Sequence, residues 1–266
     1  MMGSAEWEQG RDYVRALLSA QVEPLRRSQP MFAKGVITAM AELAIQNDQQ
    51  LQDFTYRLFD SLDEILGIDF TADEKMPTPD SVERLYAGSG RGVQSSYMTI
   101  LSILGKLRLP VGAHLMDLGS GFGRVGLTAG LWRDDIQFTG YEFVGHRVEA
   151  SNQAAKLMGI DSRVRFVQKD LAMPDFKIPK ADVYYMYDPF CVDTFRRVAG
   201  RLNQIAAEVP VTVVTKGDAG RLFISQATPG LWHDPELYDY GNLLLIRRRE
   251  ITRPENLKAH DHSIDR

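Results

Sequence analysis

Short apolar runs alternate with stretches of helical spacing from about residue 81 onward, and this alternation constrains the fold more than any other feature of the chain. The predicted strands cover residues 113–118, 136–141, 164–167, 181–186 and 211–215, and the predicted helices cover 95–107, 123–132, 146–158 and 192–207. Two further stretches, 231–240 and 243–248, are joined by Gly241 and Asn242, which predicts an antiparallel hairpin. We therefore predict an α/β fold: a doubly wound, mostly parallel seven-stranded sheet with an antiparallel C-terminal hairpin.

The first 80 residues have a different pattern. Apolar residues recur at helical spacing in three stretches, which predicts three amphipathic helices at 13–25, 32–44 and 51–66. The next stretch contains two prolines and several acids, and its composition is typical of a linker. We divide the chain into a small all-helical N-terminal domain with a linker at 67–80 (together 1–80), an α/β domain (81–250) and a polar tail (251–266).

Charge and composition exclude several classes of protein. The net charge is −4, but residues 1–80 carry seven basic and 14 acidic side chains, so an acidic segment precedes a mildly basic one. The chain therefore lacks the broad positive field of a non-specific nucleic-acid binder, and nucleic acid is the less favoured partner. The acidic segment could attract a basic partner, or its charges could simply form solvated helix faces.

The single cysteine and the lack of targeting segments indicate the compartment. Cys191 cannot form an intrachain disulfide or a cysteine-rich metal site, so we expect a free, buried thiol and no metal. No apolar run is long enough to span a membrane, and the first residues do not resemble a signal peptide. We expect a cytoplasmic protein with no membrane partner, and the oligomeric state stays open.

A glycine-rich turn follows the first predicted strand. Asp117 ends an apolar run, and Gly119, Gly121 and Gly123 alternate through the turn that opens the next helix. Such a turn directs backbone N–H groups at a ligand that approaches closely. The dinucleotide fingerprint would need a glycine where Arg124 stands, so a nicotinamide cofactor is disfavoured. A purely structural turn remains the alternative, and Arg124 could form a surface salt bridge.

Acidic residues also follow the next three predicted strands. Glu142, Asp170 and Asp188 each stand at or just after a strand end. Ligands of parallel sheets bind at the carboxyl ends of the strands, and a carboxylate can accept hydrogen bonds from both hydroxyls of a ribose. The sequence therefore predicts a binding site along this edge of the sheet.

Residues from about 93 to 249 resemble the class I S-adenosylmethionine-dependent methyltransferases in these motifs. The resemblance implies S-adenosyl-L-methionine as cofactor and methylation as activity. It implies that the methionine part is held by Asp117 and the turn residues Gly119, Ser120, Gly121 and Gly123. It further implies that Glu142 binds the ribose, and that Asp170 and the backbone N–H of Leu171 bind the adenine.

The methyl acceptor is less well defined. A weaker resemblance to non-SET protein lysine methyltransferases suggests a nitrogen nucleophile, with a protein lysine and a small molecule as the two main candidates. Asp188 would accept a hydrogen bond from that nitrogen and Phe190 would pack against the acceptor. The string Asp188-Pro189-Phe190-Cys191 departs from the Asn/Asp-Pro-Pro-Tyr/Phe motif, which disfavours methylation of bases or glutamine. In the alternative, Asp188 caps the next helix and Phe190 lies in the core.

The glycine-rich stretch 86–97 precedes the predicted α/β domain. It is typical of a loop that closes over a bound cofactor, with Tyr97 or Gln94 at the methionine end, although a plain linker would have the same composition. A non-catalytic module that binds S-adenosylmethionine is a further alternative to an enzyme.

Overall fold

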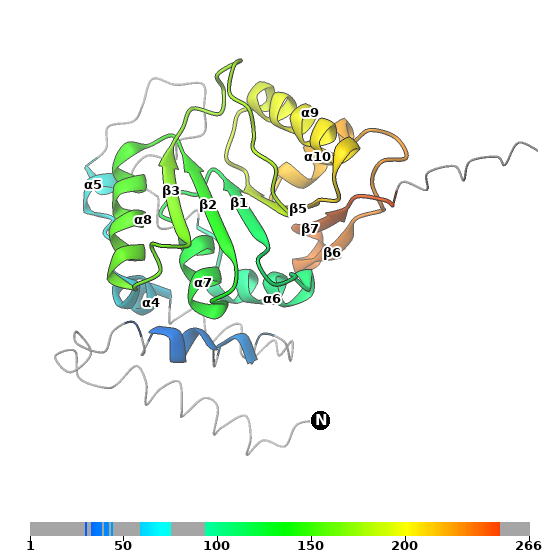
Figure 1. Cartoon of the computed structure of the whole chain (residues 1–266). Helices are drawn as coiled ribbons and strands as arrows, with labels where there is room; N and C mark the ends of the chain where they lie inside the picture. Colours follow the sequence, from blue (N-terminus) through cyan, green and yellow to red (C-terminus); the bar gives the residue numbers. More distant parts are fainter. Residues whose placement is uncertain are drawn as a thin grey trace, which may run out of the picture.

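The computed structural model describes residues 30, 33–38, 40–42, 44, 59–75 and 94–250, and a seven-stranded sheet forms its centre (Figure 1). The strands are β1 (His114–Leu118), β2 (Gln137–Glu142), β3 (Val164–Gln168), β4 (Val183–Tyr187), β5 (Thr212–Lys216), β6 (Glu236–Tyr238) and β7 (Leu243–Arg247). Their order is β3-β2-β1-β4-β5-β7-β6, with β1 to β5 parallel and β7 antiparallel to both neighbours. The predicted fold class is confirmed.

Helices cover both faces of the sheet. The helices of the sheet domain are α6 (Tyr97–Leu107), α7 (Arg124–Trp132), α8 (Gly145–Leu157), α9 (Val192–Glu208) and α10 (Ala219–Gln226). Side chains alternate along each strand, so Leu115 joins the core under α6, α7 and α8, whereas Met116 joins the core under α9 and α10. Both faces are buried, which explains the continuous apolar runs of the sequence.

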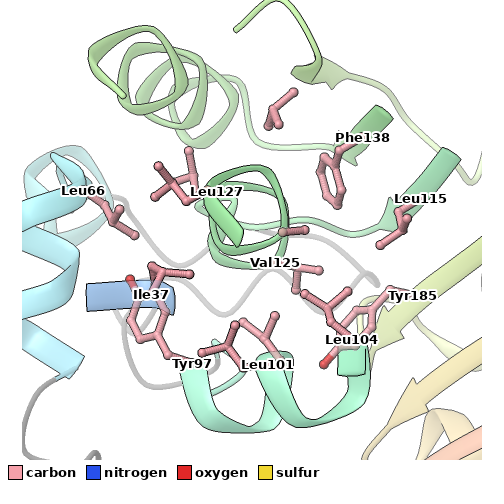
Figure 2. Packing of buried hydrophobic residues seen from close by; sticks show 14 of the residues in the cluster. Ile37, Leu66, Tyr97, Leu101, Leu104, Leu115, Val125, Leu127, Phe138 and Tyr185 are labelled. Atoms are coloured by element: carbon pink, nitrogen blue, oxygen red, sulfur yellow. The ribbon is translucent and has the colours of Figure 1, made fainter. Parts of the chain in front are cut away.

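Described residues of the N-terminal segment share the core of the sheet domain. All of those described between 30 and 44 are helical, and α4 (Phe59–Leu66) follows. Ile37 and Leu66 are fully buried in one cluster with Leu115 and Phe138, as Figure 2 shows. The division at residue 80 and the polar tail stay predictions, because 76–93 and 251–266, like the predicted helix 13–25, lie outside the described residues.

Residues 67–75 do not form the linker that the sequence predicts. They include α5 (Thr71–Glu74), and Ile68, Phe70 and Asp73 are all buried. The two prolines that indicated a linker stand at 77 and 79, after α5. The predicted linker therefore began too early in the sequence.

Two further differences lie near the C-terminal end. Helix α10 was missed because it is only eight residues long and contains Gly220. The predicted strand 231–240 shrinks to β6, because Asp239 and Tyr240 adopt left-handed conformations (φ 49° and 53°) and form the short helix η1 (Asp239–Gly241). The hairpin turn is therefore longer than the predicted Gly241-Asn242 turn. Within the described ranges, no helix has the length and apolarity to cross a membrane.

Candidate functional site

The carboxyl ends of five parallel strands meet at one edge of the sheet. Because β1 is flanked by β2 and β4, the residues that follow these strands are brought side by side. The glycine turn follows β1, Glu142 ends β2, Asp170 follows β3 and Asp188 follows β4. The sheet thus brings to one edge all the elements on which the predicted site depends.

The glycine turn has the local geometry that the sequence predicts. Gly119, Gly121 and Gly123 all have positive φ (96°, 53° and 81°), a conformation that residues other than glycine rarely adopt. The N–H groups of Gly119 and Ser120 donate to the carbonyl of Tyr141, at 2.8 and 2.9 Å, which ties the turn to β2.

Neighbouring residues also pack closely against this turn. A Cβ at position 119 would lie 2.1 Å from Pro189 Cβ, and one at 121 would lie 2.5 Å from Gln94 Nε2. Gln94 is therefore placed against the turn, and its predicted contact with a cofactor stays a prediction.

Glu142 connects β2 to the turn through both of its carboxylate oxygens. Oε2 accepts from the N–H of Gly121 and Oε1 from the N–H of Val144, each at 2.9 Å, and the residue is 7% exposed. The carboxylate thus lies directly beside the turn. Each oxygen that now accepts from a backbone N–H can instead accept a hydrogen bond from a ligand hydroxyl.

Asp117 is a buried carboxylate of a different kind. It is 3% exposed, and within the described ranges no hydrogen bond or ion pair reaches its carboxylate. Burial raises the pKa of Asp117 well above its ordinary value, and the nearby charge of Glu142 raises it further. The buried hydroxyl of Ser120 also has no hydrogen-bond partner. Buried polar groups without partners are rare in native proteins, so these two groups mark a place for a ligand with donor groups.

A cavity of about 650 Å³ opens beside the end of β3. It is lined by Phe143, Gln168, Lys169, Asp170, Met173, Asp175, Phe176 and Lys177. Its volume is in the range of small-molecule sites. Asp170 Oδ1 accepts from the N–H of Ala172 at 2.8 Å, and the side chain of Leu171 is buried in the core. Sequence reasoning missed Phe143, which is 45% exposed at this cavity, although it directly follows Glu142.

Asp188 and Phe190 have contacts close to those of the structural alternative. Asp188 Oδ1 accepts from the N–H of Ala219 at 2.7 Å, so it caps α10 and not the next helix, and Phe190 is 8% exposed within the core. Asp188 has a left-handed φ of 39°, and a Cβ on Gly217 would lie 2.0 Å from Asp188 Oδ2. The predicted catalytic roles of both residues stay predictions.

Tyr97 is the first residue of α6. It is fully buried, and its hydroxyl donates to Asp63 Oδ1 on α4 at 2.5 Å. Figure 2 shows its ring beside Ile37 and Leu101, in the apolar core under the sheet. The predicted contact of Tyr97 with a cofactor stays a prediction. The helical spacing of 95–107 indicates the burial of Tyr97, because it places this residue on the same apolar face as Leu101 and Leu104.

Arg124 forms a buried ion pair with the same carboxylate. Its Nε donates to Asp63 Oδ1 at 2.8 Å and its Nη2 donates to Asp63 Oδ2, with side-chain exposures of 4% and 2%. Arg124 therefore forms a salt bridge, as the alternative predicted, but the salt bridge is buried and not at the surface. A second acid of the N-terminal segment, Asp73, accepts from Arg147 Nε at 2.7 Å and lies 3.0 Å from His146 Nε2. We call Asp63, Asp73, Arg124 and Arg147 the anchor pairs.

Lys216, which sequence reasoning missed, ends β5 at the same edge. It is 8% exposed, and its Nζ lies 4.7 Å from the centroid of the Tyr187 ring on β4. Burial lowers the pKa of Lys216, and the charge of Asp239 opposes that effect. The signal was a basic residue directly after the apolar run 211–215.

Cys191 precedes α9 and is half-buried, less buried than predicted, with Sγ 3.6 Å from Thr194 Oγ1. Within the described residues, no group of three His, Cys, Asp or Glu side chains could hold a metal ion.

Comparison with known proteins found similarity only among solved structures. No family model and no curated protein matches the chain. The structure of TrmN from Thermus thermophilus is 17% identical, covers 57% of this chain and has a TM-score of 0.46, and the chain spans about half (48%) of its length.

Two further structures cover more of the chain. An RNA methyltransferase from Salinibacter ruber in complex with S-adenosyl-L-homocysteine is 22% identical over 68% of this chain and 99% of that one (TM-score 0.42). A precorrin-6y C5,15-methyltransferase from Geobacter metallireducens is 13% identical over 68% and 94% (TM-score 0.43). Identities and TM-scores this low assign no activity to the chain.

Proposed function

We propose that this protein is an S-adenosylmethionine-dependent methyltransferase that acts on a nitrogen nucleophile. The observation that carries the proposal is the buried carboxylate of Asp117, beside the glycine turn and followed by acids at the next two strand ends. S-adenosylmethionine presents an ammonium, a ribose diol and an adenine amine in a row. Three carboxylates along one edge can accept from these three groups.

The methionine end would lie at the glycine turn. An ammonium beside Asp117 would stabilise the ionised carboxylate, which in the protein alone is disfavoured by burial and by Glu142. Ser120 Oγ offers a further hydrogen-bonding atom. The first N–H groups of α7, which follows the turn, suit the carboxylate of the same ligand. The residues present therefore fit a zwitterionic amino acid.

The nucleoside end would extend from Glu142 toward the cavity. Glu142 would bind the ribose hydroxyls, with Asp170 and the N–H of Leu171 on the adenine. Phe143, exposed at the same cavity, could stack on a planar ring. The donors and acceptors of the edge thus follow the order of groups in the ligand.

S-adenosylmethionine, when bound, supplies a methyl group on a sulfonium that a lone pair can displace in line. The protein must then align the acceptor and keep its nitrogen unprotonated. In the proposal Asp188 accepts a hydrogen bond from that nitrogen or takes its proton, and Phe190 packs against the acceptor. A protein lysine and a small-molecule amine are the two acceptor classes that remain to be separated.

Calorimetric titration with S-adenosyl-L-homocysteine tests the cofactor assignment. We expect saturable binding to the wild-type protein and at least tenfold weaker binding to Asp117→Asn, a difference of about 1.4 kcal/mol. Asp161→Asn, an exposed acid just before the amino end of β3 and therefore at the opposite edge of the sheet, is the matched control and should bind as the wild type does. A wild-type protein that does not bind the ligand would refute the proposal.

Transfer of labelled methyl groups into a fractionated lysate tests the reaction. Label in any fraction distinguishes an enzyme from a non-catalytic binding module. Label found only in protein supports a lysine acceptor, whereas label found only in small molecules or RNA excludes it.

A further inference from the structure

Lys216 occupies the acceptor side of the proposed site. It ends β5 directly beside Tyr187, the last residue of β4, and the next residue, Gly217, packs against the carboxylate of Asp188. Lys216 therefore directly precedes the residue that contacts Asp188. Asp188 is the group that the proposed function places at the methyl acceptor.

Lys216 also lies on the same face of the sheet as Asp117. Residues two positions apart on a strand share a face, and Val214 and Leu115 both belong to the core cluster under α6 and α7. Since β4 alone separates β1 from β5, and Lys216 lies two residues beyond the position in register with Asp117, their Cα atoms lie roughly 12 Å apart, at about 4.8 Å per strand and about 3.3 Å per residue. Tyr185 and Tyr187 of β4 lie between them on this face, so an acceptor would approach Lys216 from the carboxyl ends of the strands.

The surroundings of Lys216 do not neutralise its charge. Its Nζ lies over the ring of Tyr187, and in the part of the chain that the structure describes it forms no ion pair. Asp239, whose charge acts on Lys216 from a greater distance, is exposed to solvent. A buried ammonium held only by a ring face is costly unless an anion accompanies it.

We propose that Lys216 binds a carboxylate carried by the methyl acceptor, and so selects acceptors with a negative charge close to the methylated atom. A single buried ammonium is best neutralised by a single negative charge, which favours a carboxylate over a phosphate dianion. The inference rests on the proposed function, and within it Lys216 is a specificity residue. It favours a small carboxylated amine over a protein lysine, whose ammonium Lys216 would repel.

Titration with benzoate and benzamide tests this role, because the two molecules have nearly the same shape and differ in charge. Binding is followed by the thermal midpoint of the protein, with and without S-adenosyl-L-homocysteine. We expect saturable millimolar binding of benzoate, none of benzamide, and weaker binding of inorganic phosphate. Lys216→Gln should weaken benzoate binding at least fivefold, and Lys216→Arg should retain it, because the positive charge remains.

Controls separate this inference from the proposed function. Lys156→Gln, an exposed lysine on α8, should bind benzoate as the wild type does, and Lys216→Met replaces Lys216→Gln should the latter not fold. All Lys216 variants should bind S-adenosyl-L-homocysteine within twofold of the wild type. Equal benzoate binding by wild type and Lys216→Gln, no benzoate binding, or tighter binding of phosphate would overturn the role of Lys216. Failure to bind S-adenosyl-L-homocysteine would instead overturn the proposed function.

Discussion

Buried charges occur in two regions of this protein and are neutralised in different ways. In the anchor pairs, acids of the N-terminal segment meet arginines at the starts of α7 and α8, as with Asp63 and Arg124. At the strand ends, Asp117 and Lys216 are as deeply buried, but within the described residues neither is in an ion pair. The two regions are adjacent, because Arg124 directly follows the glycine turn.

This contrast separates charges that hold the fold from charges that are available to a ligand. A paired buried charge loses much stability when one partner is removed, whereas an unpaired buried charge destabilises the protein by its presence. Groups of the second kind, with shifted pKa values, cluster at functional sites. Replacing a charged side chain by an uncharged one should therefore lower the free energy of unfolding in the first region and raise it in the second.

The largest expected effect is the loss of an anchor pair. Asp63→Ala leaves the Arg124 guanidinium buried without its carboxylate and should lower the free energy of unfolding by about 3–5 kcal/mol. Chemical denaturation measures the change. The double variant Asp63→Leu/Arg124→Met removes both charges and should recover part of the loss, because the Tyr97 hydroxyl still loses Asp63 as its acceptor. A loss below about 1 kcal/mol in the single variant would contradict a structural role for the pair.

Asp117→Asn should change the free energy of unfolding in the opposite direction. Removal of the buried charge should raise the free energy of unfolding by about 1–3 kcal/mol at neutral pH. Because the pKa of Asp117 is raised in the folded protein, its ionisation destabilises the wild type progressively as the pH rises above about 4. Denaturation across this pH range should therefore show the two proteins diverging. Equal pH profiles would mean that a partner neutralises Asp117.

Lys216→Met should stabilise the protein less, by about 1 kcal/mol, because the Tyr187 ring already offsets part of the desolvation of the ammonium. The pKa of Lys216 is lowered in the folded protein, so its destabilising effect is full below the folded pKa and is relieved as the pH rises toward 10.5. The advantage of the variant in denaturation experiments should thus shrink in alkali. A variant less stable than the wild type would place Lys216 among the structural charges.

The smallest effect is expected for a surface pair. Arg221 and Asp218 are 2.8 Å apart with side-chain exposures of 86% and 56%, so Asp218→Ala should change the free energy of unfolding by less than about 0.5 kcal/mol. The measurement sets the baseline for the buried charges. A loss comparable to that of Asp63→Ala would remove the contrast between buried and exposed pairs.

Local patterns allowed much of the fold and part of the site to be predicted. The strands and helices from β1 to β5 begin and end within about two residues of the predicted bounds. The glycine turn was predictable because positive φ is a property of single residues, and the meeting of strand ends follows from a parallel sheet. The burial of Tyr97 was not predicted, although its helical spacing with Leu101 and Leu104 indicated it.

The sequence by itself determined the alternation of strands and helices, the glycine turn and the acids that follow successive strands, because these depend on side-chain periods and on single-residue conformations. Only the tertiary structure decided which charges are paired. Asp63 meets Arg124 across 61 residues, and Asp188 caps a helix 31 residues further on. Burial and pairing are set by contacts between distant segments, and these contacts left Asp117 and Lys216 at the strand ends without an ion pair in the described structure.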